Sequence, residues 1–523
     1  MILASQAEIA QRDMPVADRD AVIERKEDCI QRLEKLVADF KRALFGARSE
    51  KTDPEQFELA LEDIETAMAV VHSEDEALDL PASRPSKPCK TNRGSLPKHL
   101  PRIEEVITRE QTLCGCGTER HVIGEDTSER LDIVPAQFRV IVTRRPKYAC
   151  RSCTNGVVQA PAPAYLIPGG MPTEATVAHV LVSKYADHLP LYRQAQIYSR
   201  QGIDLDRSTL AGWIGKAAYE LRPVFDALIA DLKGSSKLFM DETRAPVLEP
   251  GKRKTKTGYF WALARNDRPW SGAAPPGVAF TYAPGRSGQY ADDILKGFSG
   301  ILQVDGYAGY NRLLKRADDS VALAYCWAHA RRKLHEVAQS GTAPIAEEGL
   351  KQIAALYRIE KDIRGLAAEA RLAARQERSA PLIAAFEAWV TAHRARVSSK
   401  APLGEALKYI AKYWSGLVLF LDDGRVEMDS NAVERTIRPI ALNRKNALFA
   451  GHNAGAVNWG VIASLIETCK LNDVDPHTYL TGTLSAIVNG HKQSDIDALL
   501  PWNYNRLRQK GDGHEHHRNQ GHP

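Results

Sequence analysis

Five short apolar runs between residues 237 and 329 constrain the fold of this 523-residue chain more than any other feature of its sequence. Each run has the length of a buried strand, and turn residues or a helix-like segment separate one run from the next. Three strands, a helix (GRSGQYADDILKGF) and further strand material predict a mixed α/β sheet. We expect Lys252–Gly258 (KRKTKTG) to form the hairpin turn after the first run. The runs are KLFMDET, GYFWALA, GVAFTYA, ILQVDGY and ALAYCWAH.

Two acidic residues end predicted strands in this region, Asp241 in LFMDET and Asp305 in ILQVDGY. If the two strands are neighbours, both carboxylates meet at one site, and oxygen ligands of this kind suit Mg²⁺. Two such ions about 4 Å apart activate an attacking oxygen and stabilise a leaving one in phosphodiester chemistry. The pair therefore predicts a metal site that needs a third carboxylate.

Glu434 is the best candidate for the third carboxylate, because cations that suit DNA phosphates surround it and no other acid follows it up to residue 445. Asp429 is the second candidate. In an alternative interpretation, Asn431 begins a helix and Glu434 only completes its capping box. The cations around Glu434 are Arg435, Arg438, Arg444 and Lys445.

Four of the eight cysteines form two close pairs, Cys114 with Cys116 and Cys150 with Cys153. Two thiolate pairs on separate turns are what a tetrahedral Cys₄ zinc site requires. The segment before the second pair, FRVIVTRRPKYAC, alternates apolar and polar residues and predicts strands. In a reducing compartment, free buried cysteines are the other interpretation, and a disulfide framework is excluded.

Residues 175–220 predict two helices joined by a short turn that contains Gly202. Asp206 or Ser208 is expected to cap the second helix. Helix, turn and helix in this order is typical of DNA-binding proteins, in which the start of the second helix contacts bases and phosphates. Any helical hairpin has the same pattern, so simple packing remains an alternative. The expected contact residues are Arg207, Ser208 and Thr209.

The N-terminal part divides into a helix and a linker. Heptad spacing over residues 20–55 predicts a short dimerising coiled coil, although Lys26 interrupts it and an amphipathic helix packed on its own domain has the same pattern. Residues 72–102 are rich in Pro, Ser and basic residues, and predict a flexible linker that either contacts phosphates or is a solvated spacer. The apolar heptad positions are Ile23, Ile30, Leu33, Val37, Phe40 and Leu44.

The amino-acid composition excludes several classes of protein. With 44% hydrophobic and 26% charged residues, the chain is neither disordered throughout nor fibrous, and its net charge of +5 is a weak signal. No apolar run approaches the roughly 18 residues of a membrane span, and no secretory signal begins the chain. We expect a cytosolic protein with no membrane partner. Residues 331–420 read as helices rich in Ala, Leu and Arg, and the polar end, residues 506–523, is expected to be disordered.

Long motifs along residues 20–505 resemble those of the large transposases of the insertion sequence 66 family, a group of bacterial DDE transposases. One departure is Cys-x-Cys where the family usually has Cys-x-x-Cys. The matching motifs are LFGARSEK (44–51), GEDTSERLDIVPAQFRV (124–140), KYACRSC (147–153), KYADHLPLYRQ (184–194), DRSTLAGW (206–213), MDET (240–243), VDGYAGYN (304–311), CWAHARRK (326–333), NAVERTIRPIALNRKNALFAGHNAG (431–455), ETCKLNDVDPHTYL (467–480) and LLPWNY (499–504).

The resemblance implies an RNase H-like catalytic core in which Asp241, Asp305 and Glu434 are the three acids. It also implies DNA contacts by His329 and Arg332 of the CWAHARRK motif. The implied organisation is a leucine-zipper-like coiled coil at 20–55, the basic linker at 72–102, a zinc module at 104–160, a helix-turn-helix region at 172–225, the core at 235–455 with a helical insertion at about 331–425, a helical region at 456–505 and the tail at 506–523.

The function implied is cutting and joining of DNA at the ends of a mobile element. Two Mg²⁺ or Mn²⁺ ions at the three acids and one structural Zn²⁺ are the expected cofactors. Double-stranded DNA, a second copy of the chain or more, and accessory proteins of the same element are the expected partners, in the bacterial cytoplasm at the nucleoid. The alternatives are a non-catalytic zinc and helix-turn-helix DNA-binding protein, a decayed transposase, and a metal-dependent nuclease that does not join DNA.

Overall fold

The computed structural model describes residues 137–149, 157–249, 254–316, 321–339, 341–447 and 450–504. The chain divides into two compact units, Met1–Val142 and Thr143–Pro523, and nearly all of the described residues belong to the second. The predicted coiled coil, basic linker and polar tail lie outside the described residues, as do the four cysteines of the predicted zinc site.

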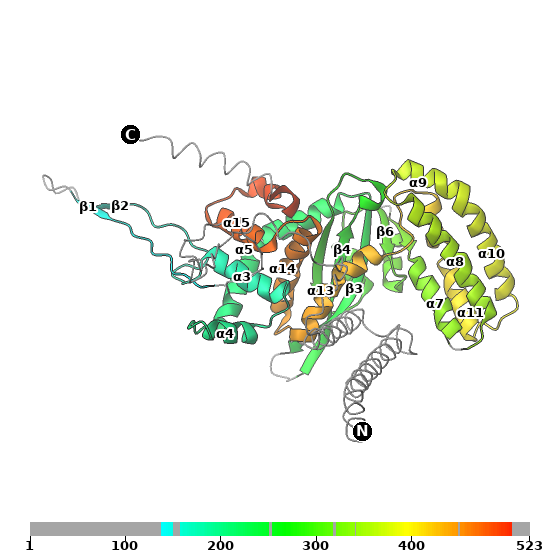
Figure 1. The fold of residues 1–523 in the computed structure, drawn as a ribbon, viewed down its shortest axis with the longest axis horizontal. Helices are drawn as coiled ribbons and strands as arrows, with labels where there is room; N and C mark the ends of the chain where they lie inside the picture. Colours follow the sequence, from blue (N-terminus) through cyan, green and yellow to red (C-terminus); the bar gives the residue numbers. More distant parts are fainter. Residues whose placement is uncertain are drawn as a thin grey trace, which may run out of the picture. The chain divides into compact units, whose positions relative to one another are not determined.

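A five-stranded mixed sheet forms the centre of the described part of the second unit (Figure 1). Its strands are β3 (Lys237–Glu249), β4 (Lys254–Arg265), β5 (Gly277–Ala283), β6 (Gly300–Val304) and β7 (Val321–Tyr325). The spatial order is β5-β4-β3-β6-β7; β3, β4 and β5 are antiparallel neighbours, and β6 and β7 continue parallel to β3. A short helix, α6 (Gly288–Ile294), precedes β6. All five predicted strands are present, and the mixed α/β sheet is confirmed.

The hairpin between β3 and β4 is longer than predicted. Glu249 pairs with Lys254, so the strands continue through most of the segment assigned to the turn, and the prediction of a turn over Lys252–Gly258 is wrong. The alternating Lys and Thr residues explain the difference: Thr favours extended backbone, and the lysines of this protruding hairpin end stay at least partly in solvent.

Helix α14 (Asn453–Leu471) covers the outer edge of β5. The backbone N–H of Phe280 donates to the Ser464 hydroxyl (2.7 Å), and that of Val278 donates to the Thr468 hydroxyl (3.1 Å). Gly460 permits this close approach, because a Cβ there would lie 2.6 Å from the Phe280 carbonyl oxygen. The helix therefore satisfies edge groups that would otherwise be open to another strand.

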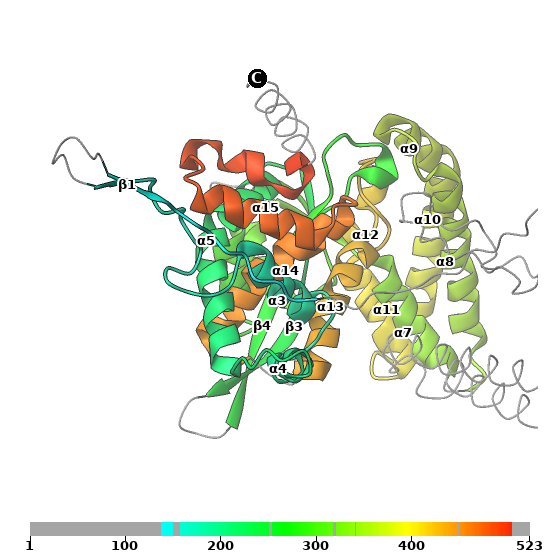
Figure 2. The same cartoon turned by 60° about the vertical axis from the view of Figure 1, so that its left-hand side comes forward.

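The helices before the sheet and at the end of the chain share one apolar core with it. Leu228 and Leu232, in the second half of α5, lie against Gly277 of β5. Figure 2 shows α3, α14 and α15 in front of β3 and β4. None of the helices that the structure describes is long and apolar enough to cross a membrane. The helices of this part are α3 (Glu174–Tyr185), α4 (Leu191–Ser199), α5 (Arg207–Lys233), α14 and α15 (Pro476–Val488).

The predicted helices of residues 331–420 form a bundle with a second apolar core, which continues onto Ile301 of β6 and Ala324 of β7 (Figure 1). Trp327 is buried there, and its indole N–H donates to the Leu417 carbonyl (2.7 Å). The helices are α7 (Trp327–Gln339), α8 (Pro344–Ile363), α9 (Ala368–Ala374), α10 (Ala380–Arg394), α11 (Pro402–Lys412) and α12 (Trp414–Leu417).

Two fully buried arginines connect this bundle to the segment that returns to the sheet. Arg375 binds the Glu360 carboxylate (2.7 Å) and the Val426 carbonyl (2.8 Å), and Arg371 binds the Glu427 carboxylate (2.8 Å). Removal of either partner of such a pair would leave a buried charge without compensation, which costs about 3–5 kcal/mol. The bundle therefore fixes the course of residues 423–428, which lead to α13 (Asn431–Ala447).

Candidate active site

Asp241 and Asp305 lie opposite each other where β3 and β6 separate. β6 runs parallel to β3, with Leu238 opposite Leu302 and Phe239 opposite Gln303. Two residues further in the same register, Asp241 comes opposite Asp305, the first residue after β6. Neighbouring strands are about 4.8 Å apart and residues two apart point to the same face, so both carboxylates project from one face of the sheet.

Glu434 reaches the site from the first turn of α13. The Ser430 hydroxyl, just before the helix, donates to the Glu434 carboxylate (3.0 Å). The backbone N–H of Asn431 donates to the Asp429 carboxylate (3.2 Å), so the alternative capping box between Asn431 and Glu434 is not formed. The Ser430 hydroxyl therefore orients the Glu434 carboxylate, and this carboxylate does not accept the Asn431 backbone N–H at the start of the helix.

The segment before α13 is fixed to the ends of two strands. The Gln303 amide of β6 makes both possible hydrogen bonds with the Glu427 backbone, at 2.8 Å and 2.9 Å. The backbone N–H of Trp327, after β7, donates to the Met428 carbonyl (2.8 Å). Since Gln303 is two residues from Asp305, one strand end both presents an acid and positions the helix that carries Glu434.

The charges of Asp305 and Glu434 both act on Asp241, so the three predicted acids lie in the same part of the structure. Burial raises the pKa of Asp241 well above its usual value, and the charges of Asp305, Glu242 and Glu434 raise it further. All three predicted acids are of intermediate exposure, so a ligand can approach them. The three carboxylates repel one another when ionised, and a divalent cation would relieve that repulsion.

The loop after Asp305 is held by the helical bundle. The Tyr409 hydroxyl of α11 donates to the Asp305 carbonyl (2.9 Å), and the Tyr413 hydroxyl donates to the Gly306 carbonyl (2.6 Å). Gly306 has a φ of +99°, a backbone conformation that favours glycine. The Asp305 side chain accepts from the backbone N–H of Tyr307 (2.8 Å). Hydrogen bonds therefore hold both the backbone and the side chain of Asp305.

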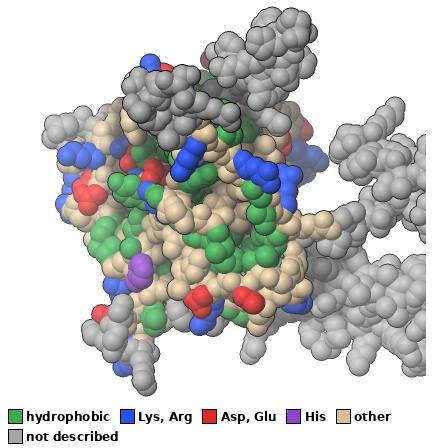
Figure 3. Space-filling view, turned by 90° about the vertical axis from the view of Figure 1, so that its left-hand side faces the viewer, with side chains coloured by type: hydrophobic (Ala, Val, Ile, Leu, Met, Phe, Trp, Pro, Cys, Tyr) green, Lys and Arg blue, Asp and Glu red, His purple; other side chains and the backbone are tan. Residues whose placement is uncertain are grey.

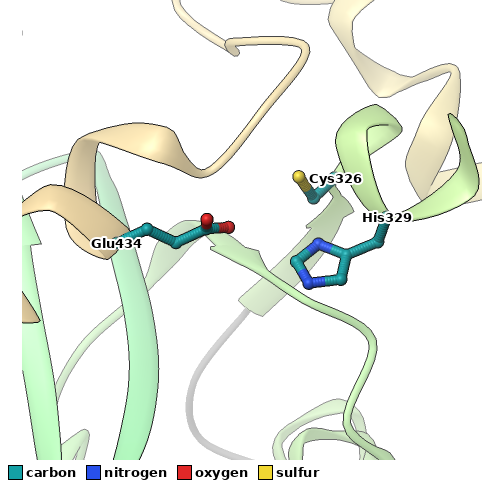
Figure 4. Close-up of side chains that lie close together, drawn as sticks. All are labelled: Cys326, His329 and Glu434. Atoms are coloured by element: carbon teal, nitrogen blue, oxygen red, sulfur yellow. The ribbon is translucent and has the colours of Figure 1, made fainter. Parts of the chain in front are cut away.

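Cys326 and His329 lie beside Glu434, and one ligand atom of each of the three lies within 4.8 Å of the others (Figure 4). Burial lowers the pKa of His329, and the charge of Glu434 acts against that shift. Its Nδ1 has no hydrogen-bond partner in the described part of the chain. Burial also raises the pKa of the Cys326 thiol, which accepts from the Ser430 backbone N–H (3.3 Å).

Glu242 is an acid of the site that the sequence interpretation did not single out. Its side chain is fully buried and pairs with Arg286 at 2.5 Å, while the Tyr310 hydroxyl donates to its other oxygen (2.7 Å). Burial raises the pKa of Glu242, and both partners act against that shift. The position of Glu242 next to Asp241 in the sequence could have indicated that it belongs to the site. The Cys-x-x-His spacing of Cys326 and His329 could have indicated the same for these two residues.

The predicted DNA contacts occupy three helices. The Asp206 side chain accepts from the Ser208 backbone N–H (2.7 Å), which confirms Asp206 as the cap of α5. On the face shown in Figure 3, Lys and Arg side chains are scattered among apolar and uncharged ones. Exposed side chains are Arg207 and Ser208 on α5, Arg332 on α7, and Arg435, Arg438 and Lys445 on α13; Thr209, His329 and Arg444 are half-buried.

Strands flank the second cysteine pair. β1 (Lys147–Ala149) and β2 (Val157–Gln159) are antiparallel, with Ala149 opposite Val157. The hairpin therefore encloses residues 150–156, which contain Cys150 and Cys153 but lie outside the described residues. Of the strands predicted before this pair, the structure assigns Lys147–Ala149.

Four family models match the chain. The model described as "Transposase IS66 family" covers residues 169–458, which include Asp241, Asp305 and Glu434. The "IS66 C-terminal element" covers 464–502, and the "Transposase C of IS166 homeodomain" covers 32–104. The "zinc-finger binding domain of transposase IS66" covers 111–154 and all four paired cysteines.

Similar proteins over nearly the whole chain occur in Sinorhizobium fredii. The uncharacterized protein y4jD is 45% identical over 90% of this chain and 93% of its own length. The uncharacterized protein y4qI is 43% identical over 96% of this chain and 94% of its own length. The uncharacterized protein y4hP is 37% identical over 91% of this chain and 89% of its own length.

Proposed function

Because the chain belongs to the IS66 transposase family, we propose that it binds the ends of a bacterial insertion sequence, hydrolyses phosphodiester bonds there and transfers the freed 3′-OH ends to target DNA. The observation that supports this proposal is that the charges of Asp305, just after β6, and of Glu434, on α13, both act on Asp241 of β3 and raise its pKa. The strand order, with three antiparallel strands followed by two parallel ones, supports the assignment of an RNase H-like core.

The donor set fits hard divalent cations. Asp241, Asp305 and Glu434 offer carboxylate oxygens, which Mg²⁺ and Mn²⁺ prefer, and their mutual repulsion favours a bound cation. We assign two such ions to these three residues. When bound, a pair of ions lowers the pKa of an attacking water and stabilises the charge on the leaving oxygen.

The residues around the acids have separate tasks. Ser430 orients Glu434, and the hydroxyls of Tyr409 and Tyr413 hold the carbonyls of Asp305 and Gly306, so the carboxylates are positioned before DNA arrives. We assign the imidazole of His329, which lies beside Glu434, to contact with the reacting strand. Water attacks one phosphodiester first and leaves a 3′-OH, which then attacks target DNA, so no covalent link between protein and DNA is needed.

DNA recognition is proposed to involve the other parts of the chain. Arg207, Ser208 and Thr209 lie at the start of α5, where a second helix presents residues to the major groove. Arg332, Arg435, Arg438 and Lys445 are assigned to phosphates. The zinc-finger region supports one structural zinc ion, for which we propose Cys114, Cys116, Cys150 and Cys153 as ligands. We further propose a dimer or larger assembly through residues 20–55.

Incubation of the purified protein with Mg²⁺ and labelled element-end DNA tests the function. We expect Mg²⁺-dependent cleavage that leaves a 3′-OH at the element end, followed by joined products when target DNA is added. EDTA should leave binding and remove cleavage. Binding without cleavage in Mg²⁺ and in Mn²⁺ would favour a non-catalytic DNA-binding protein or a decayed transposase. Cleavage without joined products would favour a nuclease.

A further inference from the structure

Three arginines line a pocket of about 400 Å³ that begins one residue beyond Asp241. We call it the arginine pocket. Of the acids of the site, Glu242 lines this pocket and the three predicted acids do not, and the proposed reaction does not by itself require the pocket. Its polar and aromatic lining residues are Glu242, Thr243, Arg244, Tyr259, Arg286 and Arg444.

The arginine pocket lies where one edge of β3 has no neighbouring strand. β6 pairs with β3 only as far as Phe239, and the next backbone pairing on the same edge joins Pro246 and Leu248 to Ala450, at 2.9 Å and 2.8 Å. Within the residues that the structure describes, no strand covers the edge between these two points. The backbone at this edge is already bonded, because the Glu242 N–H donates to the Asp241 carboxylate (2.7 Å) and the Arg244 carbonyl accepts from Arg444. The side chains that line the space beside it are therefore what a ligand leaving the carboxylates along β3 would meet.

The charges of the arginine pocket favour an anion. Arg286 is compensated by Glu242, to which it binds at 2.5 Å. Arg444 is held by neutral partners, the Arg244 carbonyl (2.5 Å) and the Thr243 hydroxyl (3.3 Å), so its charge is not compensated. Arg244 is exposed and forms no ion pair among the described residues. Two positive charges therefore remain next to a site that is itself strongly negative.

The spacing suits a DNA strand. Arg244 follows Asp241 by three residues, which is about 10 Å along a strand, and its side chain projects from the other face of β3. That distance is close to the rise of about three nucleotides in duplex DNA, at 3.4 Å each. Arg444 binds Thr243, which lies on the same face as Asp241. Guanidinium groups bind phosphate oxygens in a bidentate manner. Tyr259, opposite Arg244 on β4, adds a hydroxyl and an aromatic ring.

We propose that the arginine pocket binds a phosphate of the DNA strand within about three nucleotides of the bond that the carboxylates cut, through Arg244 and Arg444. This inference rests on the proposed function and specifies its substrate contact. By holding one phosphate at a fixed distance from Asp241, the pocket sets which bond of the strand enters the active site. It therefore determines the cut position rather than the sequence that is bound.

The test uses element-end duplexes that each carry one uncharged methylphosphonate, at successive positions of the strand to be cut. Binding is measured in EDTA, so cleavage does not contribute. For the unchanged protein, we expect one position near the cut site to weaken binding about 10-fold or more, because a charge-assisted contact is lost. The Arg244→Ala/Arg444→Ala double variant should be insensitive to that position and equally sensitive to the others.

A matched control removes two exposed arginines of the helical bundle, Arg394→Ala/Arg396→Ala. It should keep the sensitivity of the unchanged protein. If the pocket double variant does not fold, the Arg244→Ala single variant replaces it, since that side chain is exposed. Equal methylphosphonate sensitivity in the pocket variant and the unchanged protein would overturn the proposal. Because the readout is binding, this result is distinct from a failure to cleave, which concerns the proposed function.

Discussion

Asp241 has an environment that disfavours its own charge. It is largely buried, and Asp305, Glu242 and Glu434 all add repulsion, so its pKa is raised well above the ordinary value of 3.8. When the pKa of a carboxyl is higher in the folded than in the unfolded chain, the free energy of unfolding of the protein falls as the pH rises above the pKa of the unfolded chain. The site therefore carries a local cost in folding free energy, as expected where function rather than stability selects the residues.

Replacement of Asp241 by Asn should therefore increase the free energy of unfolding of the metal-free protein at neutral pH. The gain should shrink as the pH falls and should vanish below 3.8, where the unchanged carboxyl is protonated in the folded and in the unfolded protein. Added Mg²⁺ should stabilise the unchanged protein more than the variant, because the variant lacks one ligand. Denaturant unfolding in EDTA at several pH values measures this. A variant that is equally stable or less stable at every pH would contradict it.

At the scale of elements, Tyr409 of α11 and Tyr413 just after it hold the Asp305 loop across 104 and 107 residues of sequence. The Tyr409→Phe/Tyr413→Phe double variant removes both hydrogen bonds, each worth about 0.5–1.5 kcal/mol. We expect slower cleavage, unchanged end binding, and a higher Mg²⁺ concentration for half-maximal cleavage, because Asp305 is less well positioned. Tyr165→Phe, at an exposed position, is the control. An unchanged Mg²⁺ dependence would show that the bundle does not position the aspartate.

The elements were predictable where a local pattern determines them. The five apolar runs predicted all five strands. Asp206 was recognisable as a helix cap because the backbone N–H that its side chain accepts belongs to Ser208, only two residues away. The prediction of the hairpin turn was wrong because alternating Lys and Thr residues suit a turn and an exposed strand equally. The Gln303 amide contact with Glu427 spans 124 residues and leaves no local signal, so the way in which Glu434 is positioned could not be read from sequence.

At the scale of the whole molecule, the zinc-finger region is proposed to hold one structural zinc ion. Purified, reduced protein is expected to contain about one zinc per chain, since four thiolates close the coordination shell. Cys150→Ser should lower the zinc content, the stability and the DNA binding together, because metal binding is coupled to folding. Cys89→Ser, outside the two pairs, is the control and should keep its zinc. Zinc-free protein from a reducing preparation would exclude the site.

The central claim is that Asp241, Asp305 and Glu434 together make this chain a metal-dependent DNA-cutting enzyme. The most direct measurement is the cleavage rate of element-end DNA for Asp241→Asn, Asp305→Asn and Glu434→Gln, with Asp429→Asn as the matched control. Each of the three should cut at least about 1,000-fold more slowly, a loss of about 4 kcal/mol in transition-state stabilisation, and should bind the DNA as before. The control should still cut. Cleavage at an unchanged rate by any of the three variants would contradict the account.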